Sequence, residues 1–211
     1  LCNICPRRCG AERTETRGGG VCAMPAGIVA AKAMLHQWEE PVLSGTNGAG
    51  CVFFSGCNLG CVFCQNYDIS NGSVGKMYDA EGIAELMLRL QGKGAHNVNL
   101  VSPAPFVPVL ADAIRAAKNR GLSIPVVYNT NSYETLEALR MLDGLVDIYL
   151  PDLKYVSGAV SKKYSGTENY FEYAAPAVQE MFRQTGPYVM ENGLLRRGVV
   201  IRHLVLPGYL D

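Results

Sequence analysis

Short apolar runs alternate with amphipathic segments along most of this chain. Apolar runs of strand length lie at residues 51–56, 97–101, 124–128, 146–150 and 198–206. Between them, apolar residues recur at helical spacing, which predicts helices at residues 79–92, 107–119, 134–142 and 173–184. Asp79 is placed to cap the first helix, and Gly121 to end the second. Strands that alternate with helices in this way predict right-handed βαβ units and a parallel sheet.

The first fifty residues do not follow this alternation. Residues 27–35 are apolar enough for a strand or a strand pair, which we expect to cover the segment before it. His36, Glu39 and Glu40 come next, ahead of the run at 51–56, and are candidates for the substrate side of a site. Carboxylates in loops are more often simply solvated, so an ordinary surface role is the alternative.

The apolar run at residues 51–56 leads directly into three cysteines. Cys57, Cys61 and Cys64 have C-x3-C-x2-C spacing, which places three thiols in one short loop after a predicted strand. Thiolates favour iron–sulfur clusters, zinc and copper(I). A closed site needs four ligands, so three thiols would leave one iron of a cubane open to a small molecule. A zinc knuckle or a disulfide-linked loop is the alternative, and Cys51 is interpreted as a core residue.

A second group of thiols lies in the first 22 residues, which we call the leader. Cys2, Cys5, Cys9 and Cys22 form a complete set of four ligands, suited to zinc or to a fully ligated 4Fe–4S cluster. The loop between Cys9 and Cys22 is polar and glycine-rich, so burial alone cannot order it and metal ligation would. Free or disulfide-bonded cysteines are the alternative.

With Phe63 at the aromatic position, the triad resembles the C-x3-C-x-aromatic-C signature of radical S-adenosylmethionine (SAM) enzymes. The wider stretch 53–66 is similar to the uncharacterised homologues of pyruvate formate-lyase activating enzyme, and the resemblance covers nearly the whole chain. It implies a 4Fe–4S cluster whose open iron chelates SAM, and reductive cleavage of SAM to methionine and a 5′-deoxyadenosyl radical. It also implies a partial parallel (β/α) barrel and an electron donor such as flavodoxin or ferredoxin.

Polar residues follow each predicted strand, and in parallel α/β folds ligands bind at the carboxyl ends of the strands. After the triad, the next strands end at Ser102-Pro103, at Asn129-Thr130-Asn131 and at Asp152-Leu153-Lys154, and the last carries Arg202 and His203. Each group alone is usually a turn or a cap. Their recurrence at the same relative position indicates one shared site.

The resemblance assigns roles to these residues. It implies that Asn129, Thr130 and Asn131 border the SAM site and that Asp152 and Lys154 contact the methionyl end of SAM. The charges fit, because a lysine complements the carboxylate of SAM and an aspartate its ammonium or sulfonium group. His203 is implied to face the same pocket, with a histidine satisfied inside the barrel core as the alternative. Residues 101–105, Val-Ser-Pro-Ala-Pro, depart from the Gly-Gly-Glu-like stretch of many radical SAM enzymes.

Composition limits the classes of partner and the cellular compartment that we expect for the protein. The 211 residues are 48% hydrophobic with a formal net charge of zero, so we expect one substantial core and no nucleic-acid or membrane partner. No apolar run approaches the length of a membrane span, and no signal peptide is visible. Eight cysteines clustered at ligand spacings favour metal sites in a reducing compartment, which predicts a cytoplasmic protein.

Two regions are predicted: residues 1–50, the cysteine-rich leader with a connecting loop, and residues 51–211, the partial barrel. The barrel of the resembling family needs a sixth strand that this sequence does not supply. We therefore predict a barrel truncated at its C-terminal end, without its last strand. Such a barrel would leave one edge unpaired, open to burial by a partner or to strand swapping.

Two functions of different classes follow. One is a radical SAM enzyme, either an activase that abstracts hydrogen from a glycine of a glycyl-radical enzyme or an enzyme that acts on a small molecule. The other is a non-catalytic metal-binding or electron-transfer module. The residues do not identify a substrate, whose choice we assign to the leader and to residues 36–50 and 156–173.

Overall fold

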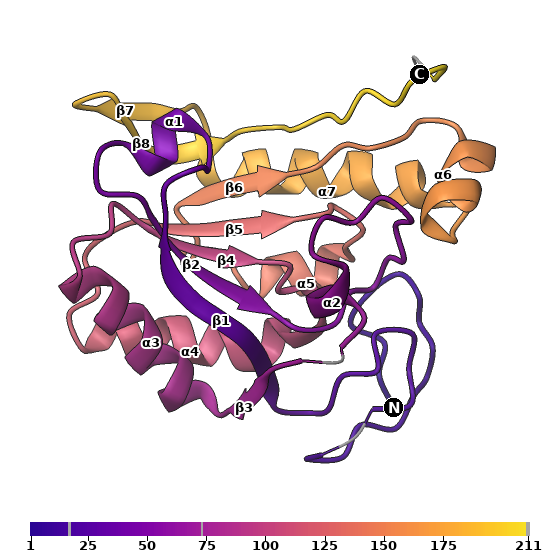
Figure 1. Cartoon of the computed structure of the whole chain (residues 1–211), viewed down its shortest axis with the longest axis horizontal. Helices are drawn as coiled ribbons and strands as arrows, with labels where there is room; N and C mark the ends of the chain where they lie inside the picture. The colour runs from indigo at the N-terminus through magenta and orange to yellow at the C-terminus, as the bar shows by residue number, and fades with distance from the viewer. Residues whose placement is uncertain (17, 73, 210–211) are drawn as a thin grey trace.

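One sheet of eight strands organises the chain in the computed structural model, which describes residues 1–16, 18–72 and 74–209. The strand order is β3-β1-β2-β4-β5-β6-β8-β7 (Figure 1). The strands are β1 (Ile28–His36), β2 (Ala49–Phe54), β3 (Lys76–Tyr78), β4 (Val98–Val101), β5 (Val126–Thr130), β6 (Ile148–Pro151), β7 (Val189–Glu191) and β8 (Leu194–Val199).

The predicted parallel sheet is confirmed. Strands β2, β4, β5, β6 and β8 pair side by side in parallel, so their carboxyl ends lie along one edge of the sheet. In Figure 1 the arrowheads of β4, β5 and β6 point toward the side where the leader, α2 and α6 lie. The sheet does not close on itself, in agreement with a partial barrel.

The antiparallel strands at both edges correct two expectations. Residues 27–35 form a strand, as one of the two expectations had it, but not a strand pair over the leader: β1 pairs antiparallel with β2, and β3 then pairs with β1. The edge beyond the last parallel strand is also paired, since β7 lies antiparallel to β8. Asn192 (φ 52°) and Gly193 (φ 77°) take the left-handed conformation that a tight hairpin turn requires.

The last parallel strand lies earlier in the chain than predicted. It ends at Val199, so Arg202 and His203 follow the strand instead of lying on it. Beyond Val199, the Val200 N–H still donates to the Tyr149 carbonyl oxygen of β6 at 2.9 Å, and one isolated bridge then pairs Asp152 with Arg202. That bridge brings Arg202 to the carboxyl end of β6.

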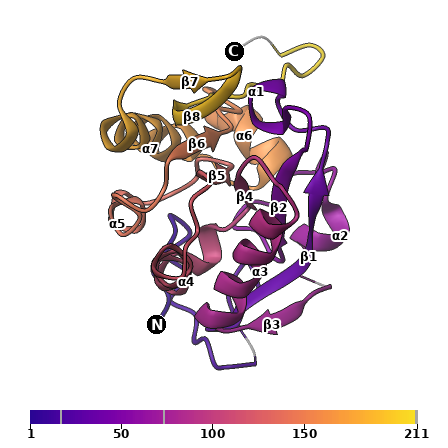
Figure 2. The same cartoon turned by 90° about the vertical axis from the view of Figure 1, so that its left-hand side faces the viewer.

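Four helices cover one face of the sheet: α3 (Ala80–Gly92), α4 (Val107–Asn119), α5 (Leu136–Arg140) and α7 (Tyr170–Thr185) (Figure 2). Their apolar faces share one core with Phe54, Leu100 and Tyr128 of the strands. Asp79 caps α3 as predicted, because its Oδ1 accepts from the Gly82 N–H at 2.8 Å. The predicted bounds of α4 are those observed, whereas α6 (Gly158–Ser165) was not predicted.

The opposite face of the sheet is also buried. Val127, Ile148 and Leu150 alternate with the residues facing the helices and pack with Leu43 of the short α1 (Pro41–Ser44). The remaining short helices are α2 (Tyr67–Ser70) and the 3-10 turn η1 (Ala104–Phe106). Among the helices of the described residues, none combines the length and the apolar character needed to cross a membrane.

Candidate functional site

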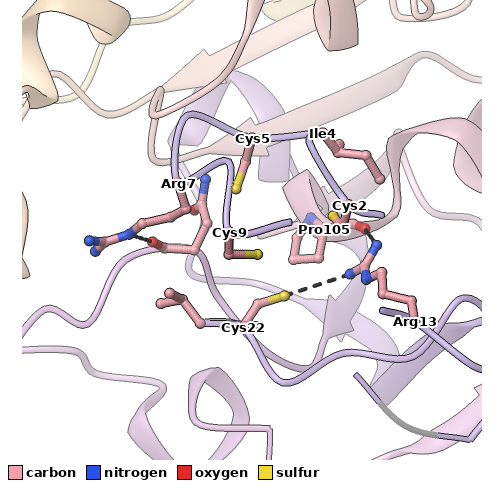
Figure 3. A pocket seen from close by; sticks show the side chains of 10 residues that line it. Cys2, Ile4, Cys5, Arg7, Cys9, Arg13, Cys22 and Pro105 are labelled. Carbon is pink, nitrogen blue, oxygen red and sulfur yellow. Dashed lines mark hydrogen bonds between the residues drawn. The ribbon is translucent and has the colours of Figure 1, made fainter. Parts of the chain in front are cut away.

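All eight cysteines are free thiols, so neither cysteine group is linked by disulfides. Cys2, Cys5, Cys9 and Cys22 of the leader line one cavity, together with Arg7 and Arg13 (Figure 3). Burial raises the pKa of Cys5 to about 11. Within the described part of the chain, no three His, Cys, Asp or Glu side chains are gathered closely enough to hold a single metal ion.

The triad loop, residues 57–64, leaves the carboxyl end of β2 directly beside the leader. Gly56 turns the chain with a positive φ of 73°. A Cβ at Gly56 would lie 2.5 Å from Met24 Cγ and 2.8 Å from the Cys22 carbonyl oxygen, so only glycine fits where the two segments meet. The two cysteine groups are therefore neighbours in space.

Hydrogen-bond donors point at the triad sulfurs. Cys57 Sγ accepts from the Leu59 N–H at 3.4 Å and from Asn131 Nδ2 at 3.3 Å. Cys61 Sγ lies 2.9 Å from Ser165 Oγ at the end of α6. Donors of this kind orient thiolate ligands and adjust the potential of a cluster. Three free thiols, two of them with such contacts, fit a cluster held through three of its irons.

Burial disfavours ionised sulfur in the triad loop. It raises the pKa of Cys57 to about 12 and also raises the pKa of Cys61. These sulfurs are therefore neutral thiols near pH 7 unless a cation is bound, because a metal centre offsets the charge of the thiolates. The Phe63 ring packs near Tyr164, with 6.4 Å between the two ring centroids.

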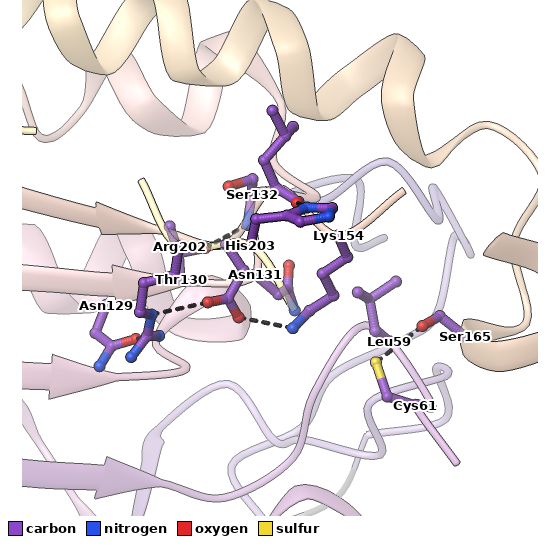
Figure 4. Close-up of polar contacts among 12 residues, drawn as sticks. Leu59, Cys61, Asn129, Thr130, Asn131, Ser132, Lys154, Ser165, Arg202 and His203 are labelled. Carbon is purple, nitrogen blue, oxygen red and sulfur yellow. Dashed lines mark hydrogen bonds and ion pairs between the residues drawn. The ribbon is translucent and has the colours of Figure 1, made fainter. Parts of the chain in front are cut away.

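A network of charged side chains continues along the same sheet edge (Figure 4). Asp152 accepts from Arg202 Nε at 2.9 Å and from Lys154 Nζ at 2.7 Å. Arg202 also donates to Asn129 Oδ1 at 2.6 Å. The structure thus joins Asn129, Asp152 and Lys154, as the sequence predicts, with Arg202 as the connecting residue.

Glu39 belongs to this network and is not a solvated surface carboxylate. Arg202 Nη1 lies 3.3 Å from Glu39 Oε1 and 3.6 Å from Glu40 Oε1. Asn99 Nδ2 donates to Glu39 Oε2 at 2.6 Å, and the Glu39 side chain is 11% exposed. Burial, together with the neighbouring Glu40, raises the pKa of Glu39 to about 7, although Arg202 opposes the shift.

Two predicted residues, His36 and Thr130, lie differently from expectation, and for His203 the structure excludes the alternative. His36 pairs with Ala49 at the start of β2, so it lies at the amino end of the parallel strands, away from the triad. Thr130 turns away from the site, because its Oγ1 donates to the buried Glu134 at 2.7 Å. His203 is exposed with Nδ1 2.6 Å from the Leu153 carbonyl oxygen, which rules out a histidine satisfied in the core.

Other residues around the triad were not singled out from the sequence. Asn58 donates through Nδ2 to the Tyr133 carbonyl oxygen at 2.6 Å and accepts from Asn131 at 2.9 Å. The segment after β4 contacts the leader, because Arg13 Nη1 donates to the Pro105 carbonyl oxygen at 2.7 Å. The position of Asn58 between two candidate ligands could have indicated its role. Nothing in the sequence around Ser165 indicated that it would contact the triad.

A family model described as the radical SAM superfamily matches residues 51–211. Two proteins of Methanocaldococcus jannaschii are similar to the whole chain. The uncharacterized protein MJ0674 is 32% identical over 219 residues, and the uncharacterized protein MJ0808 is 23% identical over 231 residues. The chain spans 58% of the length of the first and 62% of the second.

Proposed function

Because the chain belongs to the radical SAM superfamily, which implies a 4Fe–4S cluster and SAM, we propose that Cys57, Cys61 and Cys64 hold that cluster for reductive cleavage of SAM. When bound, the cluster and SAM together supply one-electron cleavage of a carbon–sulfur bond. The observation that carries the proposal is the convergence of donors on the triad sulfurs beside the ion pairs of Asp152.

The residues around the triad position and shield the reactants. Asn131 and the Leu59 N–H hold Cys57, while Leu59, Tyr133, Tyr155 and Tyr170 pack together behind the loop and keep water from that side. Lys154 is suited to the carboxylate of SAM and Asp152 to its ammonium group. Arg202 holds Asp152 in place and ties it to Asn129 and Glu39.

The more specific activity that we propose is hydrogen abstraction from a glycine of a partner enzyme. Flavodoxin or ferredoxin would be the electron donor, in the cytoplasm. Its support is the similarity of residues 53–66 to activating-enzyme homologues. A small-molecule substrate would use the same machinery, with Glu39 and Arg202 in reach of the substrate.

A SAM-cleavage assay tests the proposal. The chain is loaded anaerobically with iron and sulfide and reduced with dithionite, and methionine and 5′-deoxyadenosine are quantified after addition of SAM. Wild type should bind about four irons at the triad and form both products. Cys57→Ala, Cys61→Ala and Cys64→Ala should form neither.

Cys51→Ala is the matched control. Cys51 is a fully buried free cysteine of β2, close in sequence to the triad but outside it, so its loss should leave product formation intact. Cluster binding without a spectral response to SAM and without product would favour the electron-transfer alternative and contradict the proposal.

A further inference from the structure

The four cysteines of the leader present their sulfurs to one cavity, separate from the triad. Cys2, Cys5, Cys9 and Cys22 all line it, and Figure 3 shows them converging from both ends of the leader. Asn58 and Pro105 complete the wall from the barrel side. Four free thiols around one cavity make up the full ligand set of a thiolate metal centre.

One arginine supplies positive charge beside these sulfurs. Arg13 Nη2 lies 3.6 Å from Cys22 Sγ, whereas the guanidinium of Arg7, which also lines the cavity, donates to carbonyl oxygens of the barrel. A metal with four thiolates carries net negative charge, which the Arg13 guanidinium would partly offset.

We propose that Cys2, Cys5, Cys9 and Cys22 bind a thiophilic metal centre, and that this centre holds the leader against the triad loop so that Arg7 fixes the position of that loop. The inference goes beyond SAM cleavage, because metal binding at the leader does not require the triad.

Arg7 is the mechanical link between the two cysteine groups. Its Nε donates to the Asn58 carbonyl oxygen at 2.8 Å, beside Cys57. Its other two nitrogens donate to the carbonyl oxygens of Gly166 at 2.8 Å and Ser165 at 3.2 Å. Ser165 in turn contacts Cys61 Sγ. One side chain of the leader thus holds two of the segments that contact the triad sulfurs, the triad loop itself and the end of α6.

The leader has no regular secondary structure to order it. Its described residues form no helix or strand, only the isolated bridges of Cys2 with Ala11 and Arg13 with Gly18 and a few backbone hydrogen bonds in turns, while Ile4 and Cys22 pack against the core. The sulfurs are not close enough together to hold a single ion, and a segment whose described residues form no helix or strand can move them inward as metal binds. Metal binding would therefore order this segment and tighten its contacts with the barrel.

A chain without the triad isolates the leader site. The variant Cys57→Ala/Cys61→Ala/Cys64→Ala is loaded in one arm with Zn²⁺ and in the other, anaerobically, with iron and sulfide. We expect about one zinc, or about four irons with sulfide-to-iron absorption, per chain. Adding Cys9→Ala or Cys22→Ala should abolish binding in either arm, whereas adding Cys51→Ala should not.

Absence of stoichiometric metal in both arms, or equal binding after Cys9→Ala, would overturn the metal site. Circular dichroism of each variant verifies that the barrel is folded, so that lost binding reports the leader. Every protein here lacks the triad, so failure of SAM cleavage by the wild type would leave this result unaffected.

Hydrogen exchange tests the mechanical part in the same triad-free background. Metal should slow amide exchange in residues 57–64 by about tenfold, and Arg7→Ala should remove that slowing while metal content stays constant. Slowing confined to residues 2–22, or persisting in Arg7→Ala, would show that the leader does not position the triad loop.

Discussion

The two cysteine groups are neighbours, yet the fold holds them in different ways. The triad loop continues a central parallel strand, and Val62 N–H donates to the Tyr164 carbonyl oxygen at 2.9 Å on one side of it. Asn58 and Asn131 bind it to the end of β5. The leader lies outside the sheet and contacts the barrel through the hydrogen bonds of Arg7 to Asn58 and of the barrel residue Thr135 to Ile4, and through packing of Ile4 and Cys22 on the core.

The surroundings differ as well. The triad lies at the sheet edge that carries carboxylates and cations, Asp152, Lys154 and Arg202 among them. The leader cavity is lined by arginines without a carboxylate among its wall residues. Under the proposed assignment, the sheet end would position its ligands before metal binds, whereas the leader would gain order from its metal.

The sharpest test of this contrast compares one cysteine from each group in SAM cleavage. Cys61→Ala removes a ligand of the proposed reaction centre, so product should fall below detection. Cys9→Ala acts on the triad only through position, so the rate should fall by roughly 10–100-fold, as for supporting residues around metal ligands. Product from both variants is quantified by chromatography under identical loading, and equal losses would remove the distinction.

The pH dependence of stability tests a buried carboxyl group between the two regions. Burial raises the pKa of Glu134 to about 7, against opposing hydrogen bonds from Thr130 and Tyr128. The folded state holds this proton more tightly than the unfolded state, so its contribution is present below about pH 4.5 and is lost as pH rises to about 7.

Glu134→Gln keeps the acceptor oxygen and cannot ionise. Relative to this variant, wild type should lose up to about 3 kcal/mol of unfolding free energy between pH 4.5 and pH 7.5. Urea titrations across this range measure both proteins. Parallel curves would show that Glu134 titrates alike in the folded and unfolded chain.

The substitution Asn58→Ala tests how much the contacts between the triad loop and the end of the sheet contribute to stability. Asn58→Ala should destabilise the protein by about 2 kcal/mol, because the Tyr133 carbonyl oxygen and the Asn131 amide each lose a buried partner. Urea denaturation gives the difference. The exposed Asn3 of the leader is the matched control, and Asn3→Ala should change stability by less than about 0.5 kcal/mol.

Thr135 has the smallest expected effect. Its Oγ1 donates to the Ile4 carbonyl oxygen at 2.8 Å and accepts from the Ala138 N–H as the cap of α5. Thr135→Val should cost about 1 kcal/mol in thermal or urea unfolding, mainly through the cap. Thr46→Val, at an exposed threonine, is the control. A loss as large as that of Asn58→Ala would mean that the leader is fastened as firmly as the triad loop.

Much of the fold was predictable because its signals are local. Helical spacing located α4 to the residue, and Asp79 marked the start of α3. Asn192 and Gly193 are typical of a hairpin turn and could have predicted the hairpin of β7 and β8. The predicted strand began only at residue 198, after this turn, so the hairpin was not predicted. The apolar character of residues 27–35 correctly predicted a strand, yet nothing in these residues indicated that the strand would pair with β2.

The amino-acid sequence by itself determined which chemical groups are available: two sets of thiols at ligand spacing, and polar residues after each parallel strand. Those features depend on residue type and on spacing within a few positions. The tertiary structure alone decided which distant groups meet. Arg202 reaches Glu39 across 163 positions, and Arg7 reaches Ser165 across 158. Such pairs follow from strand order and from the path of irregular segments, which local spacing does not encode.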